Sequence, residues 1–182
     1  MNQLDHDPTR TLETVLSLPE GSPAKLPAVL MFGMPGVGKG TQGSLLGTMT
    51  GMFHVSTGAI FRNLDPASDV LILDGIPRRF RQCELLENYV EVLSVIHLEA
   101  ASDEPIVERL LERAKTQSRP DDADEQIIRR RFEIYREMTR PVLDYYSPDI
   151  VHNINPLGTQ MEVKKRILEC VIPAIRQYER AI

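Results

Sequence analysis

The residues best suited to do chemistry form a glycine-rich segment, which reads G-M-P-G-V-G-K-G-T from Gly33 to Thr41. An apolar run at 28–32 precedes it and a helix-compatible stretch follows it, in the order strand, loop and helix. Glycines permit a tight turn whose backbone N–H groups converge on phosphate oxygens at the positive end of the helix. Lys39 adds a full positive charge, and Thr41 offers a hydroxyl oxygen of the kind that phosphate-bound Mg²⁺ prefers. The spacing therefore predicts a polyphosphate cradle, with a chance glycine-rich turn as the alternative.

An acidic side chain ends another apolar run. Residues 70–73 read V-L-I-L, and Asp74 follows directly, before Gly75. Because open α/β sheets bind ligands at the carboxyl ends of their strands, Asp74 is a candidate to hold Mg²⁺, directly or through its water shell. The alternative is a turn aspartate before a glycine.

Arginine makes up most of the cationic residues, and several arginines gather in the second half of the chain. Arg109 and Arg113 are four residues apart, on one face of a predicted helix, and Arg119 and Arg131 follow. A guanidinium group clamps phosphate through two hydrogen bonds, and phosphoryl transfer needs positioning and charge stabilisation rather than a protein nucleophile. Exposed helical arginines often contact water alone, and that interpretation is kept for Arg129, Arg130 and Arg136. Asp121 and Asp122 fit a helix N-cap.

Composition restricts the class of protein. Of the 182 residues, 42% are hydrophobic and 26% are charged, so the chain can bury the core of one globular domain and is neither disordered nor membrane-spanning. The net charge of −5 makes the surface as a whole repel nucleic acid, so an anion site needs a local concentration of basic residues. Cys83 and Cys170 lack the spacing of a disulfide framework or metal site, and the polar, acidic first residues do not form a targeting peptide. We therefore expect a cytoplasmic protein that binds neither nucleic acid nor membrane.

Short apolar runs alternate with longer helical stretches, which predicts an α/β fold with a parallel sheet. The candidate strands are 28–32, 52–55, 70–73, 93–98 and 149–154. A helix is predicted at 125–138, where Ile128, Phe132 and Tyr135 have the spacing of a core-facing stripe. Residues 1–26 are expected to be an N-terminal extension with a short amphipathic helix at 11–18, and residues 27–182 one P-loop domain.

Taken in order, these motifs resemble those of the adenylate kinases, a family of nucleoside monophosphate kinases, over about residues 28–170. The resemblance rests on G-K-G-T in the phosphate loop, on S-T-G-A-I-F-R from Ser56 to Arg62, and on D-G-I-P-R from Asp74 to Arg78. It implies a P-loop three-layer fold around a central, mostly five-stranded parallel sheet. It also implies a phosphotransferase that moves the γ-phosphoryl group of Mg²⁺-bound ATP to AMP and forms two ADP.

The resemblance assigns roles residue by residue. ATP would contact Gly36, Val37, Gly38, Lys39, Gly40, Thr41, Arg109, Arg113 and Gln160. AMP would contact Thr57, Arg62, Gly75, Arg78, Gln82, Arg119 and Arg131. Gln82 would read the base, because a glutamine amide matches the donor and acceptor on the edge of adenine. The catalytic cations would be Lys39, Arg78, Arg113, Arg119 and Arg131, and Mg²⁺ would bind at Thr41 and Asp74.

The acceptor region differs from that of the family. Only eleven residues, 63–73, separate Arg62 from Asp74, whereas the family inserts several helices here that close over the monophosphate. Eleven extended residues span about 36 Å at most, which joins a helix to a strand but builds no closing domain. The lid at 114–118 is also short.

This difference leaves three hypotheses. The first is an adenylate kinase with a minimal acceptor site. The second is a nucleotide-binding protein with weak or no transfer activity, and the third is a P-loop kinase for another small acceptor. A monomer fits the sequence, and so does a homodimer whose partner completes the acceptor wall.

Overall fold

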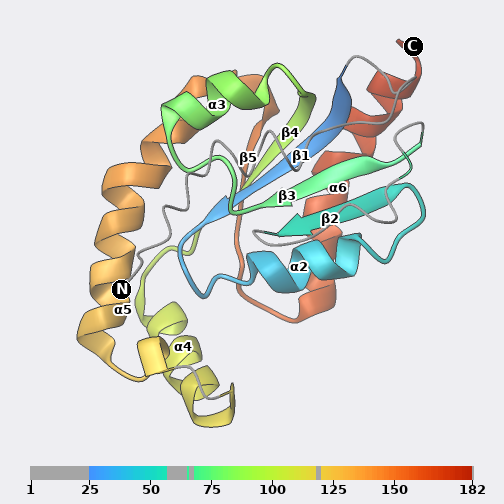
Figure 1. Cartoon of the computed structure of the whole chain (residues 1–182). Coiled ribbons are helices and arrows are strands. Elements are labelled where there is room, and N and C mark those ends of the chain that lie inside the picture. Colours follow the sequence, from blue (N-terminus) through green and yellow to red (C-terminus); the bar gives the residue numbers. More distant parts are fainter. Residues whose placement is uncertain (1–24, 57–64, 66–67, 118–119, 182) are drawn as a thin grey trace, which may run out of the picture.

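In the computed structural model, which describes residues 25–56, 65, 68–117 and 120–181, five parallel strands form one sheet (Figure 1). The strands are β1 (Leu26–Gly33), β2 (Met52–Ser56), β3 (Val70–Asp74), β4 (Val90–Leu98) and β5 (Val151–Ile154). Their order across the sheet is β2-β3-β1-β4-β5, so β1 lies in the centre. All eight residues of β1 are buried, because a central parallel strand is covered on both faces. The prediction of five parallel strands is confirmed.

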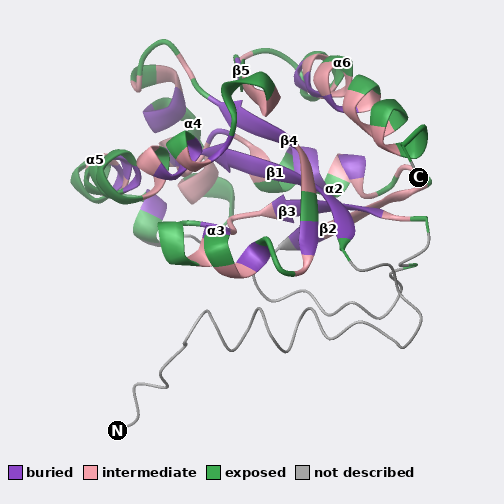
Figure 2. Ribbon diagram, turned by 90° about the horizontal axis from the view of Figure 1, so that it is seen from above, coloured by how far each residue is buried: buried purple, intermediate pink, exposed green. Residues whose placement is uncertain are grey.

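Helices cover both faces of the sheet and make three layers. They are α2 (Lys39–Leu46), α3 (Phe80–Leu86), α4 (Glu104–Gln117), α5 (Glu125–Ile134) and α6 (Gln160–Glu179). Alternate residues of β1 belong to different cores: Val29 and Met31 pack with α2, α4, α5 and α6, whereas Ala28 and Leu30 pack with α3 and the segment after α5. Figure 2 shows the buried strands between helices whose outward faces are exposed. The α/β fold is therefore the one that the sequence predicts.

The predicted helix at 125–138 is divided in the structure. α5 ends at Ile134, one π-helical turn follows at Tyr135–Thr139, and a 3₁₀ helix occupies Arg140–Tyr145. Pro141 explains the change, because proline has no N–H for the helical hydrogen bond and its ring clashes with the preceding turn. The predicted core stripe is confirmed, since its members are all buried: Ile128, Phe132 and Tyr135.

Every strand differs from its predicted bounds by one to three residues at one end or both, and the larger differences include the starts of β4 and β5. β4 starts at Val90 rather than at residue 93, and β5 starts at Val151 because Pro148–Ile150 form a 3₁₀ turn before it. The predicted helix at 11–18 lies outside the described residues, as do three site candidates, Thr57, Arg62 and Arg119. Within the described ranges, no helix combines the length and the apolar character that crossing a bilayer requires.

Candidate active site

The phosphate loop joins the end of β1 to the start of α2, and its shape depends on glycine. The φ angle is +144° at Gly33 and +89° at Gly36. A Cβ at Gly33 would lie 2.7 Å from the carbonyl oxygen of Leu98, and one at Gly36 would lie 2.6 Å from the side chain of Leu110. Larger residues are therefore excluded, and the loop backbone itself forms the surface at the positive N-terminus of α2.

Lys39 lies in the first turn of α2 and reaches back over the phosphate loop. Its Nζ donates hydrogen bonds to the carbonyl oxygens of Gly33, at 2.7 Å, and Met34, at 3.1 Å. Burial lowers the pKa of Lys39 to about 8; the carboxylate of Asp74 opposes this shift, and neighbouring guanidinium groups add to it. The ammonium group is thus held close to other cations, where a bound anion would stabilise its charge.

A pocket of 620 Å³ lies at the carboxyl edge of the sheet, beside the phosphate loop. It brings together five charged residues from four separate parts of the chain, namely Lys39, Asp74, Arg78, Arg113 and Arg131. Four of these five side chains are cations, so the pocket favours an anionic ligand although the whole chain carries a net charge of −5. The structure therefore gathers into one pocket every predicted catalytic cation that it describes.

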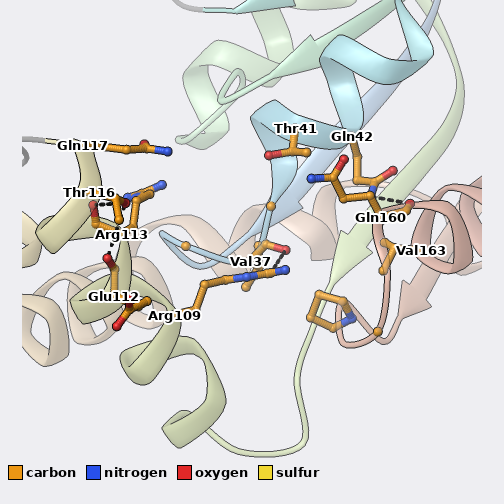
Figure 3. A pocket seen from close by; sticks show the side chains of 14 residues that line it. Val37, Thr41, Gln42, Arg109, Glu112, Arg113, Thr116, Gln117, Gln160 and Val163 are labelled. Carbon is orange, nitrogen blue, oxygen red and sulfur yellow. Dashed lines mark hydrogen bonds between the residues drawn. The ribbon is translucent and has the colours of Figure 1, made fainter.

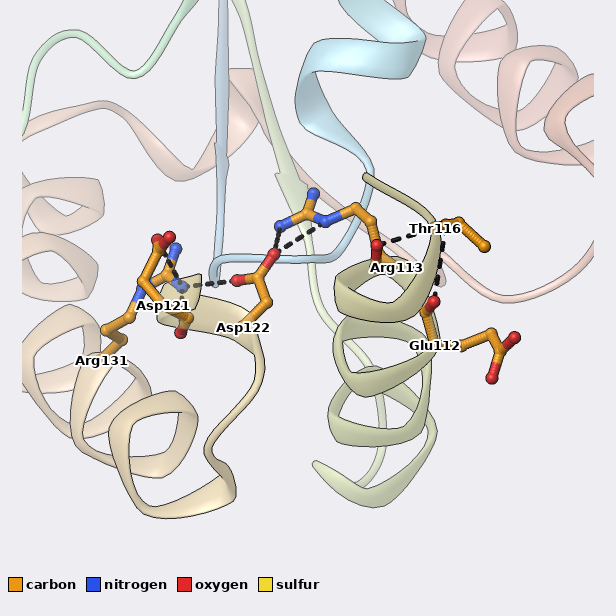
Figure 4. A network of polar contacts seen from close by, with 6 residues as sticks. All are labelled: Glu112, Arg113, Thr116, Asp121, Asp122 and Arg131. Atoms are coloured by element: carbon orange, nitrogen blue, oxygen red, sulfur yellow. Dashed lines mark hydrogen bonds and ion pairs between the residues drawn. The ribbon is translucent and has the colours of Figure 1, made fainter. Parts of the chain in front are cut away.

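One buried carboxylate holds two of these arginines, and Figure 4 shows the network. The side chain of Asp122 has 0% exposed surface. Arg113 donates to its Oδ2 from Nε at 2.9 Å and Nη2 at 2.5 Å, and Arg131 donates to its Oδ1 from Nη1 at 2.7 Å. Burial by itself would raise the pKa of Asp122, but the hydrogen bonds from Arg113 and Arg131 outweigh burial and lower it. The side chains of Arg113 and Arg131 are 30% and 31% exposed, so both can still offer N–H groups to a phosphate.

The interpretation of Asp121 and Asp122 as a helix N-cap is wrong. The N-cap of α5 is Asp124, whose carboxylate accepts a hydrogen bond from the N–H of Gln126 at 2.7 Å. A signal for Asp122 was present, because an acidic residue between two predicted phosphate-binding arginines has charges to pair with. The interpretation that Arg129, Arg130 and Arg136 contact water alone is wrong. They do not line this pocket, but each donates to a carboxylate: Arg129 to Glu125, Arg130 to Glu133 and Arg136 to Asp103.

A second pocket, of 370 Å³, adjoins the first (Figure 3). Arg109 and Arg113 of α4 line one wall, and the segment between β5 and α6 contributes Pro156, Gly158 and, at the start of α6, Gln160. Arg109 also donates to the carbonyl oxygen of Val37 at 3.4 Å, which holds it against the phosphate loop. Both pockets fall within the usual range of small-ligand sites, roughly 300–1,000 Å³. They form one continuous site, because they share Gly36, Gly38, Thr41 and Arg113.

Thr41 and Asp74 are the described residues suited to hold a divalent cation in this site. Both line the 620 Å³ pocket, and their hydroxyl and carboxylate oxygens are hard donors. Elsewhere in the described ranges, no three His, Cys, Asp or Glu side chains gather into a metal site of their own. Mg²⁺ usually takes one or two protein oxygens and shares its remaining positions with phosphates and water, so this donor set fits Mg²⁺.

Gly75 and Arg78 line the larger pocket, and Gln82 contacts Arg78 without lining either pocket. Arg78 donates from Nε to the carbonyl oxygen of Gly75 at 2.8 Å, and Gln82 Oε1 accepts from the N–H of Arg78 at 2.7 Å. The φ angle of Gly75 is +84°, and a Cβ there would lie 3.0 Å from Nη2 of Arg78. The carbonyl group of Gln82 therefore fixes the backbone of Arg78.

Comparison with curated proteins finds relatives over most of the chain, while no protein-family model matches it. An adenylate kinase of Flavobacterium psychrophilum is 34% identical, over 79% of this chain and 97% of that protein. Adenylate kinases of Thermus thermophilus and Rhodopirellula baltica are 34% and 30% identical, over 77% and 79% of this chain and 94% of each relative. The alignment with the Flavobacterium protein has 185 positions, but it includes only 79% of the 182 residues of this chain. About 40 positions of that relative therefore have no counterpart in this chain. A deletion of that size agrees with the short segment between residues 62 and 74.

Proposed function

Because this chain belongs to the adenylate kinase family, a family of nucleoside monophosphate kinases, we propose that it transfers the γ-phosphoryl group of Mg²⁺-bound ATP to AMP and forms two ADP. The observation that carries the proposal is the convergence of Lys39, Arg78, Arg113 and Arg131 on one pocket beside the phosphate loop. Four fixed cations suit two phosphorylated substrates that must approach each other despite their like charges.

The donor nucleoside would occupy the 370 Å³ pocket, between α4 and the segment that leads into α6. Arg109 and Arg113 would lie along the nucleoside and its first phosphates, and Gln160 would lie on the opposite wall. Because the two pockets share the phosphate loop, the γ-phosphoryl group would then enter the 620 Å³ pocket. Arg78 stands at the edge of that pocket, where it would bind the acceptor phosphate.

The transfer step is an in-line attack by an oxygen of the AMP phosphate on the γ-phosphorus of ATP. The bond from the γ-phosphorus to its bridging oxygen breaks, so one ADP leaves and the acceptor becomes the second ADP. A phosphate is ionised near neutral pH, and no general base is needed. Lys39, Arg113 and Arg131 stabilise charge on the transferring oxygens, and Asp122 keeps both arginines oriented. Mg²⁺ held at Thr41 and Asp74 would supply Lewis-acid stabilisation of the phosphate oxygens.

One observation favours a second candidate, a nucleotide-binding protein with weak or no transfer activity. About 40 positions of the Flavobacterium relative have no counterpart in this chain. If those positions close over the acceptor, fewer contacts hold AMP here and water stays near the transferring group. Both effects would lower acceptor-dependent turnover and leave ATP affinity intact.

The test is ADP formation from Mg²⁺-bound ATP with AMP, CMP, UMP or no acceptor. Lys39→Ala provides the blank, because it removes the cation at the phosphate loop. AMP-dependent turnover that disappears in this variant is the expected result. ATP binding without turnover on any acceptor would overturn the transfer reaction and leave the second candidate.

A further inference from the structure

The segment between β5 and α6, residues 155–159, is held by a side chain to which the proposed function gives no role. Arg166, in the second turn of α6, donates from Nη1 to the carbonyl oxygens of Asn155 and Leu157, both at 2.8 Å. We propose that Arg166 is a positioning residue, which keeps this segment in the shape that receives the donor nucleoside. The inference rests on the proposed function, because it takes the 370 Å³ pocket as the donor site.

Regular secondary structure does not hold the segment, since β5 ends at Ile154 and α6 begins at Gln160. Within it, the N–H of Leu157 donates to Oδ1 of Asn155 at 3.0 Å and makes a local turn. Gly158 has a φ of +115°, and a Cβ there would lie 2.8 Å from Oε2 of Glu162. These features bend the chain locally, but a bend needs a further contact to be fixed against the rest of the fold.

The residues that Arg166 binds alternate with residues that line the pocket. Asn155 and Leu157 accept its hydrogen bonds, whereas Pro156 and Gly158 line the donor pocket. A charged donor shared by two carbonyl groups restrains the residue between them, because charge-assisted hydrogen bonds are stronger than neutral ones. Loss of the guanidinium group would therefore release the pocket wall, although Arg166 itself does not line the pocket.

Other contacts hold the last residue of this segment and the first residue of α6. Gln42, which follows Thr41 in α2 and is 3% exposed, donates from Nε2 to the carbonyl oxygen of Gln160 at 3.0 Å (Figure 3). Oε2 of Glu162 accepts from the N–H of Thr159 at 2.7 Å and from its Oγ1 at 2.8 Å, and closes a capping box at the start of α6. These contacts hold Thr159 and Gln160, whereas the hydrogen bonds of Arg166 hold the part of the wall between Asn155 and Leu157.

The test separates nucleoside binding from phosphate binding. Calorimetry would give the dissociation constants of Mg²⁺-bound ATP and of Mg²⁺-bound inorganic tripolyphosphate, which has no nucleoside. The proteins are wild type, Arg166→Met, Arg166→Lys and the control Arg176→Met, which removes an exposed arginine from the same helix. Arg166→Met should weaken ATP binding about tenfold and change tripolyphosphate binding less than about twofold. Arg166→Lys should recover part of the loss, since lysine keeps a charged donor, and Arg176→Met should change neither constant.

An equal change for both ligands would overturn the proposal, because it would indicate a general loss of structure rather than a displaced nucleoside wall. An unchanged ATP constant in Arg166→Met would overturn it as well. Binding is measured without turnover, so the proposed reaction can fail independently: a wild type that binds ATP but shows no AMP-dependent turnover would refute the transfer alone. A wild type that binds neither ligand would overturn both proposals.

Discussion

Replacing Asp122 by asparagine keeps the shape of the side chain and removes its charge. In the wild type, three hydrogen bonds of 2.5 to 2.9 Å connect this buried carboxylate to Arg113 and Arg131. The amide would turn an NH₂ group toward one of the two guanidinium groups, so at least one arginine would lose its acceptor. The variant therefore tests whether Asp122 keeps Arg113 and Arg131 in the orientation that the transfer reaction needs.

The burial of Asp122 and its partners determines how much Asp122→Asn lowers the free energy of unfolding. Removing one partner of a buried ion pair costs about 3–5 kcal/mol. Here the side chains of Arg113 and Arg131 are 30% and 31% exposed and can regain water, so we expect a smaller loss. A loss of about 2–3 kcal/mol near neutral pH would lower the melting temperature by roughly 4–12 °C in a domain of this size.

The effect on turnover comes from lost orientation. Deleting one donor that stabilises developing charge costs about 10²–10³ in kcat. In Asp122→Asn both arginines remain but are no longer held, so we expect kcat to fall about 10–100-fold, with a smaller change in the KM for ATP.

Thermal unfolding and initial rates of ADP formation from ATP and AMP measure both effects. Asp121→Asn is the matched control, because that neighbouring side chain is 59% exposed and its Oδ2 lies 3.4 Å from Nη1 of Arg131. A surface pair of this kind contributes about 0.5 kcal/mol or less. The reasoning is refuted if both variants unfold at the same temperature, or if Asp122→Asn keeps the wild-type kcat.

Three further predictions concern pH and packing. The pKa of folded Asp122 is lowered from its ordinary value of 3.8, so its contribution to stability is present above that value and is lost as the pH falls through the folded pKa; denaturant unfolding should show the difference between wild type and Asp122→Asn shrinking below about pH 4. Because burial lowers the pKa of Lys39 to about 8, ATP affinity should fall as the pH rises through that value, and an ATP dissociation constant that stays flat there by calorimetry would contradict this. Gly47 ends α2 with a φ of −65°, which alanine adopts readily, yet a Cβ there would lie 2.7 Å from Cβ of His54. Gly47→Ala should therefore destabilise the fold by about 1–3 kcal/mol, and a raised melting temperature would show that the contact relaxes freely.

Much of the fold and part of the site follow from local pattern. The apolar runs predict all five strands. The physical reason is clearest for β1 and β3, because parallel strands buried on both faces read as continuous apolar segments. The orientation of Arg131 also follows from spacing: it lies three residues after Ile128 and four before Tyr135, on the face that packs inward. Arg129 and Arg130 lie elsewhere around the same helix and pair with surface glutamates.

The sequence by itself determined the strand, loop and helix of the phosphate site, because those depend on residues within a turn or a strand of one another. Only the tertiary structure decided which charges pair inside the site. Asp122 binds Arg113 and Arg131, each nine residues away and on a different helix, and Arg166 binds a segment that precedes its own helix. Such partnerships depend on how α4, α5 and α6 pack against the sheet. Hydrogen bonds require distances correct to a few tenths of an ångström, which packing establishes and residue spacing alone does not.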